Sequence, residues 1–204
     1  PTMTQAKAEN NAEAVFKRHR GILRTSKALA LGIHPRTLYR LRDSGRLVEV
    51  SRGVYRLASL PEPDQPDLMV VASRVPQAVI CLISALSFHG ITTQVPREVY
   101  IALPRGTTTP RLRHPPIRVF RLTGRAYKEG IETHVLGGLR VRIYNPEKTV
   151  ADCFRFRNKI GLDVALEALR LSRERKGATP RSLLHYARMD RVEKVMRPYL
   201  EALA

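Results

Sequence analysis

The chain of 204 residues has no tryptophan, two cysteines and few aromatic residues, which make up 6% of it. Cys81 and Cys153 lie far apart in apolar stretches, without the close pairs that a zinc site or a disulfide framework needs. We therefore expect both thiols to be buried and reduced. Long apolar runs are also missing, and the first residues show no secretory signal. The sequence predicts a cytoplasmic protein that does not enter a membrane.

Acidic residues are scarce. The chain has 18 Asp and Glu against 36 Lys and Arg, which gives a formal net charge of +18. A charge of this size repels itself in the compact state and is typical of proteins that meet a polyanion. Nucleic acid is the first candidate, and an anionic membrane or an acidic protein are the others. The excess of arginine suits bidentate contacts to phosphate and guanine, although a GC-rich coding bias explains it equally well.

The first part of the chain has the pattern of three helices followed by a hairpin. Residues 4–20 favour a helix, and residues 25–31 favour a second one that ends at Gly32, where a turn needs a positive φ. A third helix begins at His34 or Pro35, and two short strands in residues 47–57 follow it. This order predicts an N-terminal winged helix-turn-helix.

Basic side chains fall on the elements that meet DNA in such a domain. The second helix of a helix-turn-helix lies in the major groove. With Leu38 and Leu41 in the core, Arg36, Thr37 and Arg40 are expected to project outward. Arginine can pair with guanine and threonine can touch a thymine methyl group, while an arginine at the hairpin tip can enter a minor groove. The expected DNA-binding residues are Arg24, Lys27, His34, Arg36, Thr37, Tyr39, Arg40, Arg46 and Arg52. A protein-interaction module with solvated arginines is the alternative.

Residues 60–67 contain three prolines and three acids, which predicts a linker. We therefore expect a winged helix-turn-helix in residues 1–60, a Pro-rich linker in 61–67 and an α/β domain in 68–204. The second domain shows a buried helix from Pro76 to His89, a Gly137-Gly138 hairpin signal and helices towards its end. The expected fold class is α+β, with a small, mostly antiparallel sheet and a C-terminal helical region in the second domain.

The second domain shows no catalytic set. A metal-dependent nuclease needs clustered carboxylates and a lysine on strands, and the expected strands carry only Glu98 at an edge and Glu132. Glu147 is expected to stabilise a helix start and Asp152 to lie at the surface or cap a helix. The histidines lack the spacing of a metal site. We expect no enzyme activity, no metal and no cofactor.

The second domain does carry basic groups. Several arginines fall on neighbouring expected strands and one loop, where they could follow DNA phosphates or contact a protein partner. A solvated sheet face explains them equally well. The residues of this second candidate surface are Arg105, Arg111, Arg113, Arg118, Arg140 and Arg142.

Three stretches together resemble a known family. G-I-H-P-R-T-L-Y-R-L (32–41) with R-G-V-Y (52–55) is similar to the N-terminal winged helix of the AbiEi antitoxins of type IV toxin–antitoxin systems. S-A-L-S-F-H-G-I-T-T-Q-V-P (84–96) and N-P-E-K-T-V-A-D-C-F (145–154) are similar to the C-terminal domain of that family. A departure is His34, where the family more often has a small capping residue such as serine.

The resemblance implies a bacterial transcriptional repressor linked to abortive infection. Such antitoxins bind inverted repeats in the promoter of their own operon, and their C-terminal domain antagonises a nucleotidyltransferase-like toxin, so that Arg105 to Arg142 could face either DNA or toxin. Two alternatives stay open. One is a winged-helix regulator without a toxin, and the other is a winged helix joined to a nuclease-like domain.

Overall fold

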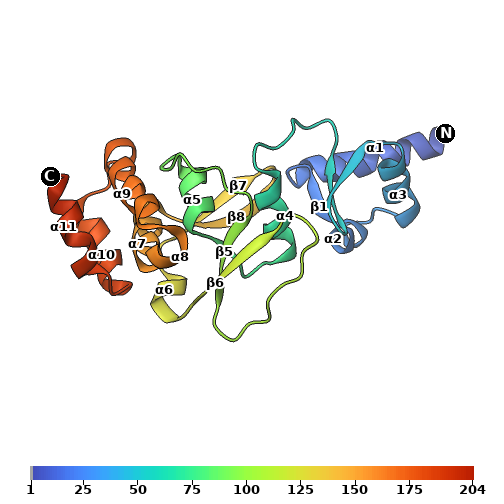
Figure 1. The fold of residues 1–204 in the computed structure, drawn as a ribbon. Helices are drawn as coiled ribbons and strands as arrows, with labels where there is room; N and C mark the ends of the chain where they lie inside the picture. Colours follow the sequence, from blue (N-terminus) through green and yellow to red (C-terminus); the bar gives the residue numbers. More distant parts are fainter. Residues whose placement is uncertain (1) are drawn as a thin grey trace. The chain divides into compact units, whose positions relative to one another are not determined.

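The computed structural model describes residues 2–204, which form a mixture of helices and strands (Figure 1). The chain divides into two compact units: unit 1 consists of Pro1–Pro76 and Val135–Arg140, and unit 2 of Gln77–His134 and Val141–Ala204. The units do not have the bounds predicted for the domains, and independent folding of residues 1–60 stays a prediction. Within residues 2–204, no helix is long and apolar enough to cross a bilayer.

Unit 1 is built on a three-stranded antiparallel sheet of order β1-β3-β2. Tyr55 of β3 faces the helices, where it packs with Phe16, Leu38 and Leu41. The expected core positions Leu38 and Leu41 are confirmed. The elements are α1 Met3–Arg18, β1 Ile22–Arg24, α2 Thr25–Ala30, α3 Pro35–Asp43, β2 Leu47–Ser51, β3 Val54–Leu57 and α4 Pro66–Arg74.

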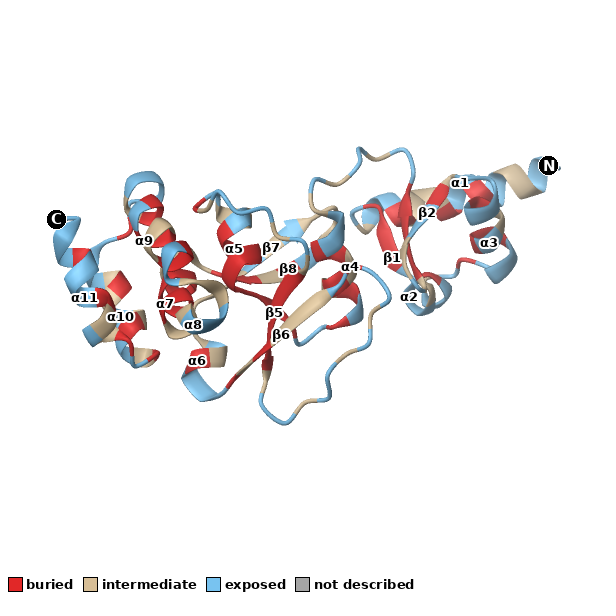
Figure 2. Cartoon of the chain, in the orientation of Figure 1, coloured by how far each residue is buried: buried red, intermediate tan, exposed pale blue. Residues whose placement is uncertain are grey.

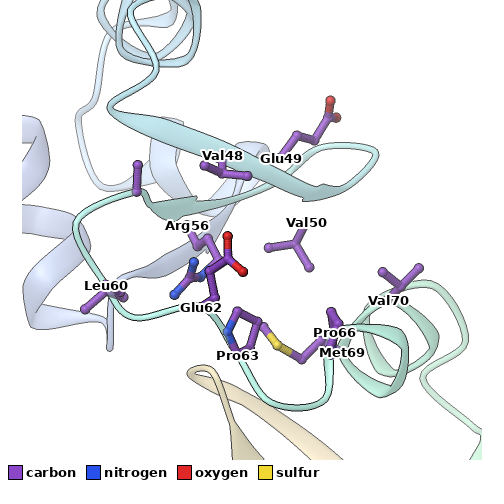
Figure 3. Close-up of a pocket in the computed structure, with 11 residues that line it drawn as sticks. Val48, Glu49, Val50, Arg56, Leu60, Glu62, Pro63, Pro66, Met69 and Val70 are labelled. Atoms are coloured by element: carbon purple, nitrogen blue, oxygen red, sulfur yellow. The ribbon is translucent and has the colours of Figure 1, made fainter.

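The other face of this sheet is covered by the segment that we expected to be a linker. The Arg56 Nη2 donates to the backbone oxygen of Pro61 at 2.6 Å, and α4 places Met69 against Ile22 and Val54. Between β2 and α4 a shallow cavity of about 350 Å³ remains, into which Val50 and Met69 project (Figure 3). The Pro-rich segment therefore packs on unit 1.

Unit 2 contains most of a five-stranded sheet of order β6-β5-β4-β8-β7, of which the β7–β8 turn with Val135–Arg140 belongs to unit 1. β4 pairs with β5 antiparallel but with β8 in parallel, and β5 pairs with β6 in parallel. The expected antiparallel character is thus only partial. The strands are β4 Val79–Ile80, β5 Val99–Pro104, β6 Ile117–Leu122, β7 Ile131–Leu136 and β8 Leu139–Tyr144, and the last two meet at the expected Gly137-Gly138 turn.

Helices complete unit 2, and the C-terminal helical region is confirmed. Buried residues are concentrated on β5, α5 and α7 (Figure 2), and a single cluster joins Leu86, Phe120, Phe154 and Leu169. The helices are α5 Leu82–His89, α6 Gly124–Lys128, α7 Pro146–Arg155, α8 Arg157–Ile160, α9 Leu162–Lys176, α10 Pro180–Met189 and α11 Glu193–Ala202.

Candidate nucleic-acid interface

Local hydrogen bonds fix the starts of α2 and α3. The Thr25 N–H donates to the backbone oxygen of Gly53 at 2.8 Å, so the start of α2 is fixed to the hairpin turn. At the start of α3, the His34 Nδ1 accepts from the Arg36 N–H at 3.2 Å, with Pro35 in the first turn. His34 therefore caps the helix in place of the serine, threonine, asparagine or aspartate most common at this position.

The exposed face of α3 differs from the expected one. Thr37 is 9% exposed and lies on the same side as Leu41, because residues four apart share a helix face. It borders a small cleft that Ala12 of α1 also lines. The expectation that Thr37 projects outward is therefore wrong. Arg36 and Tyr39, three residues apart, remain on the exposed side.

Two of the expected contact arginines are held by α1. The Arg46 Nε donates to Glu13 at 2.7 Å, its Nη1 to Glu9 at 2.9 Å and its Nη2 to Asn10 at 3.2 Å. The hydrogen bond from Glu13 raises the pKa of Arg46. Arg40 also lies 3.6 Å from Glu9. These carboxylates neutralise much of the charge that we expected to face phosphate, so both arginines serve to attach α3 and β2 to α1.

Arg42 is an exposed basic group that the sequence analysis did not assign to the site. Its guanidinium carbon lies 4.9 Å from the centre of the Tyr39 ring, and its Nε donates to Asp43 at 2.8 Å. The hydrogen bonds that Arg42 donates to Asp43 and then to Tyr55 raise the pKa of Arg42. Arg42 lies three residues from Tyr39 and six from Arg36. This spacing places the three side chains on one face of the helix and could have identified Arg42 from the sequence. The exposed face of α3 is therefore Arg36, Tyr39 and Arg42.

The remaining predicted contacts of unit 1 lie around α3. Lys27 is exposed on α2, and Arg52 is exposed at the β2–β3 turn. The turn is held by Glu49, whose Oε1 accepts from the Gly53 N–H at 3.0 Å. The Arg24 Nη2 donates to the backbone oxygen of Ser73 at 2.6 Å, which fastens β1 to α4. Two of these three cations are thus available to a ligand, and Arg24 is engaged.

The second candidate surface does not lie in one unit. Arg140 belongs to unit 1 and the other five arginines to unit 2. Arg118 lies over the rings of Tyr100 and Phe120, at 5.5 and 5.4 Å, and Arg142 lies 5.7 Å from the centre of the Tyr127 ring. The exposed members between β5 and β6 are Arg105, Arg111 and Arg113. The aromatic rings hold Arg118 and Arg142 in place, while the other arginines extend into solvent.

Two charged residues of α7 form a buried pair, although Asp152 was expected at the surface or as a helix cap. Lys148 and Asp152 have side chains 0% and 1% exposed, and the Nζ donates to both carboxylate oxygens at 2.6 and 2.7 Å. They lie four residues apart, so the ion pair closes within one helix turn.

Cys81 and Cys153 are both buried, as expected, and both belong to unit 2. Burial raises the pKa of both thiols. Across residues 2–204, no group of three His, Cys, Asp or Glu is placed to hold a metal ion.

Comparison with known proteins bears on the first of these sites. Residues 12–58 match the family model described as "Transcriptional regulator, AbiEi antitoxin", and no curated protein matches the chain. The fold is similar to the crystal structure of the RV2827C protein from Mycobacterium tuberculosis, with a TM-score of 0.54 and 16% identity over 96% of this chain and 81% of that one. At this identity the likeness is one of fold alone. The predicted resemblance to the AbiEi antitoxins, a family of transcriptional regulators, is confirmed over residues 12–58.

Proposed function

We propose that residues 1–60 form a winged helix-turn-helix that binds double-stranded DNA. The observation that carries this proposal is the exposed basic face of α3, formed by Arg36, Tyr39 and Arg42, at the position of a recognition helix in the element order α1, β1, α2, α3, β2, β3. The match to AbiEi regulators over the same segment supports it.

In the proposed complex, α3 lies in the major groove. Arg36, in the first turn of α3, reaches a guanine edge through two N–H groups. Tyr39 and Arg42 lie one turn further on and reach a base edge or phosphate. Lys27 contacts phosphate and sets the register, and Arg52 enters the adjacent minor groove or holds its phosphates. The anchored residues orient these groups without touching the bases; they are Arg24, His34, Thr37, Arg40 and Arg46.

The family match leads to a more specific role. The chain is proposed to repress its own operon by binding inverted repeats in the promoter, and to act as a type IV antitoxin against a cognate nucleotidyltransferase-like toxin in the bacterial cytoplasm. It needs no cofactor or catalysis for either role. Co-expression with the toxin-like gene next to it tests the second role: restored growth supports it, and unrelieved toxicity contradicts it.

A gel-shift titration tests the DNA contacts. We expect the double variant Arg36→Ala, Arg42→Ala to bind the operon's inverted repeats at least about tenfold more weakly, because each base-reading arginine contributes about 1–3 kcal/mol. The matched control is Arg170→Ala, Arg181→Ala, which removes two exposed arginines of unit 2. Equal affinities of the wild type and the α3 variant would overturn the assignment of this face.

A further inference from the structure

Unit 2 contains a polar cavity of about 560 Å³ that plays no part in the proposed DNA contacts. Its wall comes from the start of α6, the end of α7 and the turn between α10 and α11. Each of these elements contributes one arginine, namely Arg125, Arg155 and Arg191. A volume of this size is in the range of sites for small molecules.

A buried carboxyl group forms part of the wall. Asp190 has a side chain 0% exposed and lies within hydrogen-bonding reach of the carboxyl group of Asp152. The Arg155 Nη1 lies 3.6 Å away, which is an ion-pair distance but too long for a hydrogen bond. Buried polar groups are nearly always paired in folded proteins, and a proton shared between Asp190 and Asp152 satisfies this pair without a ligand.

The arginines are set for an anion. Arg155 lies over the Phe156 ring, 5.4 Å from its centre, which limits its motion. Arg191 adopts a φ of 58°, a left-handed conformation that is costly for a residue with a Cβ atom. Arg125 pairs with Glu129 at 2.5 Å, which neutralises part of its charge. The guanidinium groups of Arg155 and Arg191 are therefore the main candidates to bind an anionic ligand.

We propose that this cavity binds the phosphate monoester group of a small molecule about the size of a nucleotide. A phosphate monoester carries up to two negative charges and only acceptor oxygens at its terminus, which matches several guanidinium donors. The inference is independent of the DNA contacts on α3, since every lining residue belongs to unit 2.

Asp190 adds a pH dependence to this site. Its burial and the nearby carboxylate of Asp152 raise the pKa of Asp190 to about 9, against the opposing charges of Lys148 and Arg155. At neutral pH the group is therefore an uncharged carboxylic acid behind the arginines, out of direct reach of the ligand. Above pH 9 it becomes an anion that repels the ligand, so binding weakens as pH rises through this value.

Calorimetric titration at constant ionic strength tests the site with inorganic phosphate, adenosine 5′-monophosphate and adenosine. We expect the two phosphates to bind and adenosine not to bind. Arg155→Gln and Arg191→Gly should each weaken phosphate binding at least about tenfold. Glycine also relieves the left-handed backbone at position 191, so the loss of binding should come without a loss of thermal stability. The matched control is Arg181→Gln, an exposed arginine of α10.

Three results would overturn the proposal. Adenosine could bind as tightly as its monophosphate, Arg191→Gly could bind phosphate like the wild type, or a DNA duplex without terminal phosphates could displace the bound monophosphate. The last result would assign the arginines to a DNA surface. A fourth measurement uses Asp190→Asn, whose amide carries no charge at any pH: its binding should not weaken between pH 7 and 10, and a decline equal to that of the wild type would contradict the role of Asp190.

Discussion

The availability of a guanidinium group to a ligand depends on the acceptors beside it. Arg46 meets Glu13 and Glu9 within hydrogen-bonding distance, so contact with a phosphate would require these bonds to break. Arg36, two residues into the exposed start of α3, carries the same formal charge and is exposed to solvent. At the residue scale, the guanidinium of Arg36 is therefore a stronger candidate for a DNA contact than that of Arg46.

The same reasoning at Asp190 gives a prediction for stability. Its pKa is about 9 in the folded protein and ordinarily about 3.9 in an unfolded chain. Between these values the folded state holds a proton that the unfolded state has lost, so the contribution of this group to stability is present below pH 4 and is lost as pH rises to 9. The free energy of unfolding should fall by up to about 1.4 kcal/mol per pH unit from this group alone.

Unfolding in urea, followed by circular dichroism at pH 5, 7 and 9, measures this effect. Asp190→Asn has no titrating group at the position, so its stability relative to the wild type should increase steadily with pH. Asp64→Asn, which changes an exposed aspartate, serves as the control and should follow the wild type. A constant difference between Asp190→Asn and the wild type at all three values would contradict the raised pKa.

At the scale of elements, one arginine connects α1 to the segment between α3 and β2. Arg46 connects three side chains of α1 to the start of β2, and Glu9 among them is 8% exposed. We expect Arg46→Ala to lower the free energy of unfolding by about 1 kcal/mol, a value limited by the partial exposure of the arginine. Amide hydrogen exchange should become faster in α1, and Arg52→Ala should leave it unchanged. Faster exchange in both variants would show that Arg46 has no special role.

Some of these elements could be predicted from the sequence and others could not. Leu38 and Leu41 fixed the core side of α3 by their spacing, and Gly32 and Gly137 marked turns that no other residue type adopts as easily. The side of α3 that faces α1 could not be predicted, because Thr37 is polar and gives no sign of burial. Lys148 and Asp152 have the pattern of an exposed helix pair, and their burial depends on helices distant in sequence.

The parallel strand pairs of the five-stranded sheet could not be predicted from the sequence either. β4 is two residues long, Val79–Ile80, inside a stretch that the hydrophobic pattern assigns to a helix. It nevertheless pairs with β5 on one side and β8 on the other. A strand this short has no periodicity to detect, so its position between two strands, and hence the mixed sheet, follows from long-range pairing alone.

At the scale of the whole molecule, the net charge of +18 acts on any duplex regardless of its sequence. The salt dependence of binding separates this general attraction from defined contacts, since each phosphate contact adds about 0.9 to the slope of log K against log salt concentration. We expect Arg52→Ala to reduce that slope by about 1, on the operon's inverted repeats and on a scrambled duplex alike. Arg170→Ala removes the same charge from α9 and should leave the slope unchanged. Equal reductions in both variants would mean that net charge, and no particular face of unit 1, determines DNA binding.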